Sequence, residues 1–437
     1  MEGLGTQGAQ PPLRRSVFLV MMLPNWLVAL ILADALGAPS PPQAHTFTPI
    51  QHFDGLDHEG QVLQPTADEV VILARWFRHS GSRVSLAAGG NHLDQTLPRC
   101  DFHSCARLGS LVVTTRDQGD DTHVLESQQA GLPHTPWTHN LGPANVLSVT
   151  AVGTGIQVLL STPRSATAEE LLGFDAEGTA LWRVVPPADA LPEIWPAGEE
   201  LVVLTPDEAH IIEAATGVTH QVLDIPGGEI EMAAATPKTL VVSRGHQRAR
   251  LLRIKRSDGS VAWSKRTTTT ALKVVDDMVL ACTAGGSVVT RALDNGRLQW
   301  SYGLGFRCTS VWSVPVAPDQ PARMMAAGPN GRFVVFEADP SPAPLERYAV
   351  RGRVLVDRRP QRGVRVHVGD RWARTNEHGR YEVRARGRGT LRIWVELPDS
   401  AVGRGRVLNW EPRATVELSG VHSYRRDLVT DTGMDDH

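Results

Sequence analysis

The stretch Leu251–Trp263, LLRIKRSDGSVAW, carries the pattern that decides the fold. An alternating apolar run leads to a turn at Asp258-Gly259, and a Trp follows four residues after the Gly. Three further copies keep this order: LLGFDAEGTALW with Gly178 and Trp182, HIIEAATGVTHQ with Gly217 but Gln221 in place of the Trp, and VVTRALDNGRLQW with Gly296 and Trp300. The chain therefore contains an internal repeat, and its architecture follows from what one copy can form.

The repeat has a period near 40 residues. A stretched copy with Gly131 and Trp137, and a last copy around Phe336 that lacks both marks, extend it on either side. The Gly residues at 131, 178, 217, 259 and 296 are 47, 39, 42 and 37 residues apart. Such a period is typical of a solenoid or a propeller.

Each copy predicts antiparallel strands. A second, more apolar run precedes the alternating one, at residues 157–160, 201–204, 240–243 and 278–282. Period two predicts strands, and Asp-Gly or Asn-Gly before the Trp strand predicts a hairpin turn, because both residues take positive φ at little cost. Four-stranded units of this length form propeller blades. We therefore expect an all-β chain whose residues 65–346 form a β-propeller of about seven four-stranded blades, with six or eight as alternatives.

The copies resemble the quinoprotein-type repeat of PQQ-like β-propellers, whose pattern is roughly Ala-x-Asp-x-x-Thr-Gly-x-x-x-Trp. In that family the Trp packs between neighbouring blades. The resemblance implies that the repeat residues are structural blade locks: Gly178, Trp182, Gly217, Gly259, Trp263, Gly296 and Trp300. Quinone-dependent members carry adjacent cysteines and metal-holding acidic residues, whereas this sequence has no Cys-Cys pair and no evident Asp/Asn cluster. No cofactor and no metal is therefore expected.

A second, smaller domain is predicted after a Pro-rich linker at 339–347. Period-two runs predict strands near 349–356, 363–368, 380–384 and 390–396, with turns at Gly387-Arg388-Gly389 and at 376–379, where Gly379 is expected at positive φ. The blocks at 352–354, 363–366 and 375–381 resemble the carboxypeptidase regulatory-like domain, a transthyretin-like fold. The resemblance implies a small accessory β-sandwich over residues 347–430 without catalytic residues, followed by a polar tail at 431–437.

Residues 1–37 are predicted to be a signal peptide with an N-terminal signal helix. Arg14-Arg15 precede an apolar run at 16–33, and Ala33-Asp34-Ala35 is a small-residue cleavage site. An uncleaved signal anchor is the alternative, because 18 apolar residues just reach the length of a membrane span, although Pro24-Asn25 interrupt them. Residues 38–64 are expected to be a lead-in linker. Export predicts a periplasmic, cell-envelope or extracellular protein, or a membrane-anchored one if residues 16–33 remain.

The four cysteines agree with export. Local pairing of Cys100 with Cys105 and of Cys282 with Cys308 is the simplest of three possible connectivities. Structural disulfides are typical of oxidising compartments. A zinc site is disfavoured, because the four residues have no Cys-x-x-Cys spacing.

Charge is uneven along the chain. The formal net charge is −3, which predicts no general affinity for nucleic acid. From Tyr348 onward, however, there are 18 Arg, no Lys and 12 acidic residues, whereas the remainder carries 26 basic and 35 acidic residues. Contact with an anionic surface would fit this asymmetry, but a solvated face rich in Arg is the favoured interpretation.

Two groups of residues in the sequence could in principle bind a metal ion. His123 and Glu126 have the His-x-x-Glu spacing of a zinc peptidase, but in a strand residues i and i+3 point to opposite faces. A denser group of potential ligands follows the predicted signal peptide, and a polar lead-in explains it equally well: His52, Asp54, Asp57, His58 and Glu59. No metal site is predicted from either group.

The sequence thus predicts a non-catalytic binding or scaffold protein of the cell envelope or exterior. Propeller loops and the accessory β-sandwich are expected to contact protein or glycan partners, without nucleic acid, and with the membrane only through an uncleaved N-terminal segment. A degenerate quinoprotein-type enzyme or an unrecognised hydrolase, with its site in the propeller channel, is the alternative. A membrane-anchored sensor is a third hypothesis.

Overall fold

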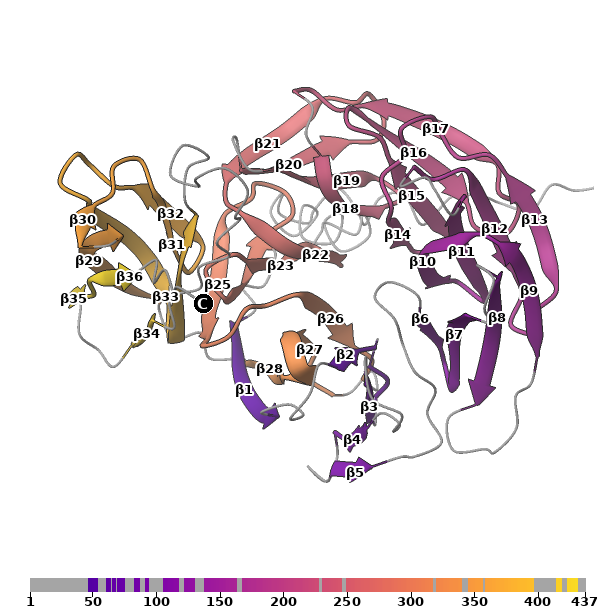
Figure 1. Cartoon of the computed structure of the whole chain (residues 1–437), viewed down its shortest axis with the longest axis horizontal. Helices are drawn as coiled ribbons and strands as arrows, with labels where there is room; N and C mark the ends of the chain where they lie inside the picture. The colour runs from indigo at the N-terminus through magenta and orange to yellow at the C-terminus, as the bar shows by residue number, and fades with distance from the viewer. Residues whose placement is uncertain are drawn as a thin grey trace, which may run out of the picture. The chain divides into compact units, whose positions relative to one another are not determined.

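The computed structural model shows an all-β propeller (Figure 1). It describes residues 46–53, 60–63, 65–67, 69–74, 82–86, 91–93, 105–117, 122–129, 137–162, 167–227, 230–245, 249–316, 320–339, 345–356, 358–396, 414–418 and 423–430. Within these ranges the one helical element is the 3-10 turn η2 (Pro329–Gly331), and no helix is long and apolar enough to cross a membrane. The expected signal peptide lies outside the described residues.

Five sheets each consist of four strands that are consecutive in sequence and antiparallel. They are β2 (Gly60–Val62), β3 (Glu69–Ala74), β4 (Ser82–Ser85) and β5 (Asn91–Leu93); β6 (Cys105–Leu108), β7 (Leu111–Asp117), β8 (Thr122–Gln129) and β9 (Thr138–Pro143); β10 (Asn145–Val152), β11 (Gly155–Ser161), β12 (Glu170–Phe174) and β13 (Ala180–Val184); β14 (Ile194–Ala197), β15 (Glu200–Leu204), β16 (Glu208–Glu213) and β17 (Thr219–Asp224); and β18 (Ile230–Thr236), β19 (Thr239–Arg244), β20 (Arg250–Lys255) and β21 (Val261–Arg266).

Two further groups of four strands depart from this plan. The first, β22 (Thr269–Val275), β23 (Met278–Thr283), β24 (Ser287–Ala292) and β25 (Leu298–Leu304), continues through β25 into the C-terminal strands. The second combines β26 (Ser310–Val314), β27 (Arg323–Ala327) and β28 (Phe333–Asp339) with β1 (Thr46–Phe53) from the other end of the chain, in the order β1-β28-β27-β26.

The second strand of each sheet from β10 to β25 is deeply buried, and in β22–β25 the third strand, β24, is buried as completely. In β19 and β23 every residue is buried, whereas the fourth strands β13 and β17 are largely exposed. A strand that has a neighbouring sheet on both of its faces needs apolar side chains on both faces. This is why the most apolar run of each copy falls on the second strand, at 157–160, 201–204, 240–243 and 278–282.

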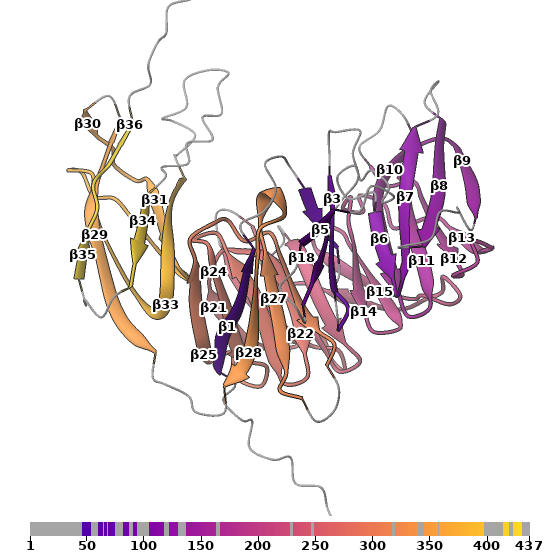
Figure 2. The same cartoon turned by 90° about the horizontal axis from the view of Figure 1, so that it is seen from below.

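The expected lead-in linker at 38–64 contains two strands, which corrects that prediction. β1 pairs antiparallel with β28, and β2 begins at Gly60. Figures 1 and 2 both show β1 beside β28. β1 is an edge strand with a register shift between Pro49 and Gln51, the setting in which a strand tolerates proline. The last copy, around Phe336, lacks its Gly and Trp because β1 supplies the fourth strand of this sheet.

The turns before the Trp strands are not two-residue hairpins. Of each expected pair only the Gly has positive φ, with 82° at Gly178, 73° at Gly217, 68° at Gly259 and 68° at Gly296. The residue before the Gly instead accepts a backbone hydrogen bond on its side chain at three of these turns. Asp258 Oδ1 accepts from the N–H of Ser260 at 2.9 Å, for example. Each turn is therefore longer and ends in a bulge, which the register shifts confirm.

The Trp of one sheet lies on the Gly of the next sheet. The Trp182 indole N–H donates to the Ala214 carbonyl at 2.9 Å, and a Cβ on Gly217 would come within 2.7 Å of the Trp182 ring. Trp263 repeats both contacts with Leu293, at 2.8 Å, and with Gly296. Trp137 does the same with Ala176, also at 2.8 Å, and Gly178. The Gly thus provides the space into which the preceding repeat inserts its indole.

The last sheet receives its Trp differently. Trp300 makes edge-on contacts with Phe47 of β1 and Phe336 of β28, at centroid distances of 5.6 and 5.2 Å. The expected disulfide between Cys282 and Cys308 is present and joins β23 to the segment before β26. Cys105 is also disulfide-bonded, and its expected partner, Cys100, lies outside the described residues.

Where Gln221 replaces the Trp, a polar contact takes its place. Gln221 Nε2 donates to the Arg256 carbonyl at 2.5 Å, and no atom outside the immediate chain lies within 4 Å of a Cβ built on Gly259. The Arg256 side chain is 7% exposed, and its two terminal nitrogens, Nη1 and Nη2, donate to the Glu200 carboxylate at 2.6 and 3.1 Å. His220 Nε2 lies 2.9 Å from the same carboxylate. An ion pair therefore bridges the two sheets at this point.

Burial raises the pKa of Glu200, but the hydrogen bonds and charge of Arg256, with a smaller contribution from His220, outweigh it, so the net pKa is lowered. A lowered carboxyl pKa contributes stability above the unfolded-state pKa, and this stability is lost as pH falls through the folded-state value.

We expect Gly217→Ala to destabilise the protein more than Gly259→Ala. Both glycines have positive φ, which costs an alanine about 1 kcal/mol. Only Gly217 lies under an indole, and overpacking there adds about 1–3 kcal/mol. Urea unfolding followed by tryptophan fluorescence measures both variants. Equal losses would contradict the inter-sheet contact.

Glu200→Gln is expected to lower the unfolding free energy by about 2–3 kcal/mol at neutral pH, because it leaves the buried Arg256 without a charged partner. The loss should shrink below the unfolded-state pKa of 4.5. The test is to measure the urea unfolding midpoints of the wild-type protein and of Glu200→Gln at several pH values between neutral pH and the onset of acid unfolding. A difference that is independent of pH would contradict it.

Candidate binding surface

The C-terminal strands form their own core beside the propeller. They are β29 (Glu346–Val356), β30 (Arg359–Pro360), β31 (Arg365–Val368), β32 (Arg371–Arg374), β33 (Arg380–Glu396), β34 (Ala414–Glu417), β35 (Ser423–Arg425) and β36 (Leu428–Thr430). The first half of β33 pairs with β29, and its second half pairs with β31 and β34. Alternate residues such as Val350, Val383 and Ile393 are buried in one cluster.

Seven arginines lie on the outward face of β33, β29 and β35. Tyr348, Val350, Tyr381 and Val383 alternate inward to the core, so the residues between them point outward. These outward residues form what we call the arginine face: Arg347, Arg351 and Arg353 on β29, Arg380, Arg384 and Arg386 on β33, and Arg425 on β35.

The strand register places like charges opposite one another on this face. Arg353 pairs with Arg380, and Arg347 pairs with Arg386, across the β29–β33 ladder. Arg351 also lies opposite Arg425 of β35. Like charges at opposed positions destabilise a sheet. The face therefore has a cost that an anionic partner would relieve.

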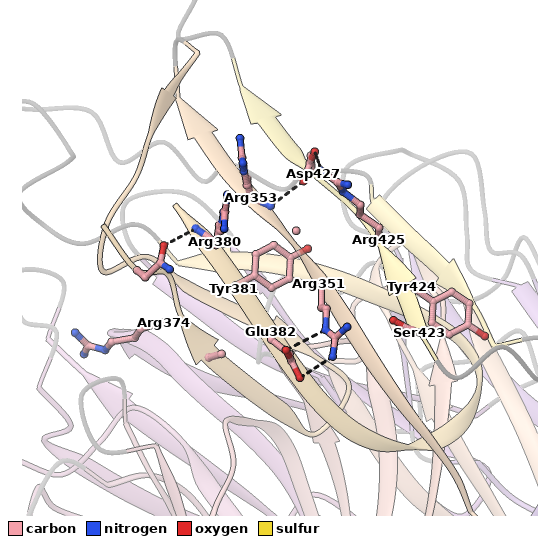
Figure 3. A pocket seen from close by; sticks show the side chains of 13 residues that line it. Arg351, Arg353, Arg374, Arg380, Tyr381, Glu382, Ser423, Tyr424, Arg425 and Asp427 are labelled. Carbon is pink, nitrogen blue, oxygen red and sulfur yellow. Dashed lines mark hydrogen bonds and ion pairs between the residues drawn. The ribbon is translucent and has the colours of Figure 1, made fainter. Parts of the chain in front are cut away.

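One carboxylate interrupts the positive charge. Arg351 donates to Glu382 at 2.9 and 3.3 Å (Figure 3). Arg384 donates to the same carboxylate at 2.5 Å. Hydrogen bonds from Arg351 and then from Arg384 lower the pKa of Glu382, so it remains ionised. Arg425 lies 3.9 Å from Asp427 at the margin. Glu382 and Asp427 thus pair with Arg351, Arg384 and Arg425 of the face.

Two hollows adjoin the face and share Arg351 and Ser423. The first, of about 690 Å³, is lined by Arg353, Arg380 and Arg425 among others, with Tyr381 at its centre in Figure 3. The second, of about 1230 Å³, extends towards Arg297 and Gln299 of β25. The arrangement suits the binding of a carboxylate or phosphate by bidentate guanidinium hydrogen bonds.

The pair Gly387 and Gly389 holds the module against the propeller and does not form the expected turn. β33 is continuous from Arg380 to Glu396, and its middle pairs in parallel with β25 at Tyr302–Leu304. A Cβ on Gly389, where φ is 80°, would come within 2.4 Å of the Gly303 carbonyl oxygen. The two glycines permit the close approach of a second backbone. The prediction of a turn at residues 387–389 is therefore wrong. The expected turn at 376–379 is confirmed, with φ of 69° at Gly379.

A buried ion pair reinforces this junction. Arg291 of β24 donates to Asp370 at 3.1 Å, and their side chains are 4% and 1% exposed. Burial lowers the pKa of Arg291, and Asp370 opposes that shift. Thr283 Oγ1 donates to the Gly369 carbonyl at 2.7 Å, and Arg266 lies 3.6 Å from the centre of the Trp372 ring. All three contacts join propeller strands to residues 369–372 of the C-terminal module.

The other sequence candidates lie away from this surface. Apart from Gly259, which has no neighbour within 4 Å of a built Cβ, the Gly and Trp residues of the repeat contact neighbouring sheets. Cys282 and Cys308 form a disulfide. His123 and Glu126 lie on β8, where Glu126 is paired with Arg116. Asp54, Asp57, His58 and Glu59 lie outside the described residues. Within the described ranges, no three His, Cys, Asp or Glu side chains lie together as metal ligands would.

Sequence reasoning found the excess of arginine but not the face. Period-two alternation in VRGRV and RYEVRARGR was the available signal, because it places every second residue outward. The register between the two runs depends on a pairing across about 30 residues, which alternation alone does not specify.

The comparisons with known proteins agree on the propeller. The PQQ-repeat family described as "Outer membrane protein assembly factor BamB" matches residues 167–357, less than half of the chain. BamB from Moraxella catarrhalis is 12% identical, with a TM-score of 0.45, over 67% of this chain and 100% of that one. The WD40 β-propeller domain of Doa1 is 10% identical, with a TM-score of 0.50, over 67% and 97%. No curated protein sequence matches.

The match supports a PQQ-like repeat domain with a β-propeller fold, which the sequence analysis expected. The carboxypeptidase regulatory-like resemblance has no counterpart among these matches, so the identity of the C-terminal module stays a prediction.

Asp370→Asn should lower the unfolding free energy by about 3 kcal/mol, because it leaves Arg291 buried without a charged partner. Glu382→Gln is the matched control. It removes a carboxylate from an exposed ion pair and should leave the unfolding midpoint nearly unchanged. Chemical unfolding followed by tryptophan fluorescence measures both. A loss for Glu382→Gln as large as that for Asp370→Asn would refute the proposed anchoring role of Asp370.

Proposed function

We propose that this protein is a non-catalytic scaffold or binding protein of the cell envelope or exterior. The match of residues 167–357 to a family described as an outer membrane protein assembly factor carries the proposal. That stretch includes the sheets β14–β17, β18–β21 and β22–β25 and continues into β29.

We infer that the ring has seven blades. The five sheets of consecutive strands count as five, β22–β25 counts as the sixth and β26–β28 with β1 counts as the seventh. Pairing of the first described strand with the last propeller strand closes such a ring, because it removes the two free sheet edges that an open array would leave.

We further propose that β29–β36 form an accessory β-sandwich. β33 contributes to two sets of strand pairings around one core, with β29 on one side and with β31 and β34 on the other. Two sheets packed over a shared apolar core define a sandwich. The β25–β33 pairing and the Arg291–Asp370 pair support a fixed attachment to the propeller.

The two parts would offer different contacts. Propeller loops provide a rigid rim for protein or glycan partners, and the arginine face provides a contact for an anionic one. Export through residues 1–37 remains part of the proposal, and the Cys282–Cys308 disulfide supports an oxidising compartment.

The proposal predicts that the full chain, carrying a C-terminal tag, fractionates with the envelope or the exterior of its own cells. N-terminal sequencing of the exported protein then separates a cleaved signal from an anchor at 16–33. Recovery in the cytoplasm with the N-terminus intact would contradict the proposed location.

The purified protein is expected to show no quinone absorbance after dialysis and no hydrolase activity towards peptide or ester substrates. Denatured protein and a buffer blank are the controls. A quinone band that survives dialysis would instead support the degenerate quinoprotein.

A further inference from the structure

We propose that the arginine face binds a second copy of this chain, at an acidic edge of the sheet β14–β17. The interface would be head-to-tail, because the two surfaces differ. It goes beyond the scaffold function and does not depend on the identity of any envelope partner.

The charge of the chain is segregated more sharply than its net value shows. Between residues 184 and 237 there are ten acidic residues and no Lys or Arg. This stretch spans the whole of β14–β17. The C-terminal region, from Tyr348 on, carries 18 Arg and no Lys. One chain therefore holds two surfaces of opposite sign.

Three carboxylates form what we call the acidic edge: Asp207, Glu208 and Asp224. Glu208 and Asp224 are directly opposed across the β16–β17 ladder. The N–H of Ile225 donates to the Asp207 carbonyl at 2.6 Å, which places Asp207 beside them. Asp207 and Asp224 are exposed. Among the described residues, the one basic group in contact with the edge is His210, whose Nε2 lies 3.0 Å from Glu208 Oε2. Like charges thus oppose one another here, as they do on the arginine face.

An apolar side chain next to the acidic edge provides the second observation. Val222, two residues before Asp224 on the same face of β17, is 49% exposed. Lysine and arginine cover apolar surface with their aliphatic stems while their charged ends stay near water. An exposed valine beside carboxylates therefore suits arginine better than a small inorganic cation, which has no aliphatic part to cover it.

A chain cannot satisfy its own arginines in this way. The sheets β18–β21 and β22–β25 lie between β14–β17 and the module in the order of the propeller, and the module is paired to β25. Contact between the two surfaces therefore requires another molecule. Repetition of a head-to-tail contact gives a closed ring or an open chain of copies.

Arg353 and Arg380 are the residues on which the contact should depend most. They are directly opposed and exposed, and among the described residues neither guanidinium is in a salt bridge with a carboxylate; Arg353 reaches Asp427 through its backbone N–H alone. Arg351 and Arg384, in contrast, are paired with Glu382. Charges that are unpaired in the free protein lose no existing ion pair when they bind.

The test is the oligomeric state of the purified full-length protein, measured by sedimentation velocity over a range of concentrations. We expect concentration-dependent self-association at about 0.05 M salt and its loss at about 0.5 M salt, because screening weakens exposed charge pairs. A wild-type protein that stays monomeric at low salt overturns the proposal without affecting the scaffold function.

Charge reversal identifies the two surfaces. Arg353→Glu/Arg380→Glu and Asp207→Lys/Asp224→Lys should each weaken self-association at least about tenfold. The matched controls, Arg359→Glu on β30 and Asp294→Lys after β24, change exposed charges outside both surfaces and should associate as wild type does. Circular dichroism confirms that all four variants are folded.

Mixing the two reversed variants gives the decisive result. Each retains one intact surface, so an equimolar mixture should form a one-to-one complex, while either alone stays monomeric. A chain reversed at both surfaces should regain self-association with opposite polarity. Failure of both restorations overturns the proposal.

Vesicles containing an anionic phospholipid test the alternative partner. We expect that any binding of the wild-type protein to these vesicles is unchanged in Arg353→Glu/Arg380→Glu. Arginine-dependent binding to these vesicles by a protein that remains monomeric would assign the face to a lipid surface and overturn the proposal.

Discussion

The packing of a tryptophan ring on the Cα of a glycine in the next sheet is the contact on which the propeller depends. Trp182 over Gly217 and Trp263 over Gly296 each combine ring packing with an indole hydrogen bond to a carbonyl shortly before the Gly. The ring needs the space that a Cβ would fill, and the buried N–H needs an acceptor. Both needs are met only by a neighbouring repeat, so one copy cannot form the contact alone.

The repeats that depart from the pattern show what else can join two sheets. Gln221 keeps the hydrogen bond to the carbonyl before the Gly but lacks the ring, and the Arg256–Glu200 pair occupies the junction instead. Trp300 keeps the ring but meets Phe47 and Phe336, because the last sheet takes its outer strand from β1. A polar junction carries a cost in desolvation that an apolar one does not, and its strength depends on pH.

The C-terminal module continues the propeller through β25. A free strand edge invites pairing with another chain, and β33 covers this one with Gly387 and Gly389 at the point of closest approach. Alternation along β29 and β33 places the arginines of the module on the face away from its own core. The same chain has an acidic sheet two blades earlier, and we infer that the two surfaces meet between molecules.

Of three possible cysteine connectivities, the sequence by itself favoured the pairing of Cys282 with Cys308 but did not decide it. It determined the all-β propeller with its PQQ-like repeat and the positions of the buried second strands. These follow from alternation, a fixed period and short-range spacing, which are local properties. Only the tertiary structure decided the role of β1, the continuity of β33, the partner of each Trp and the arginine face. Each of these depends on a pairing between segments far apart in sequence. Local alternation specifies which side chains share a face, but not which strand lies opposite or in which register.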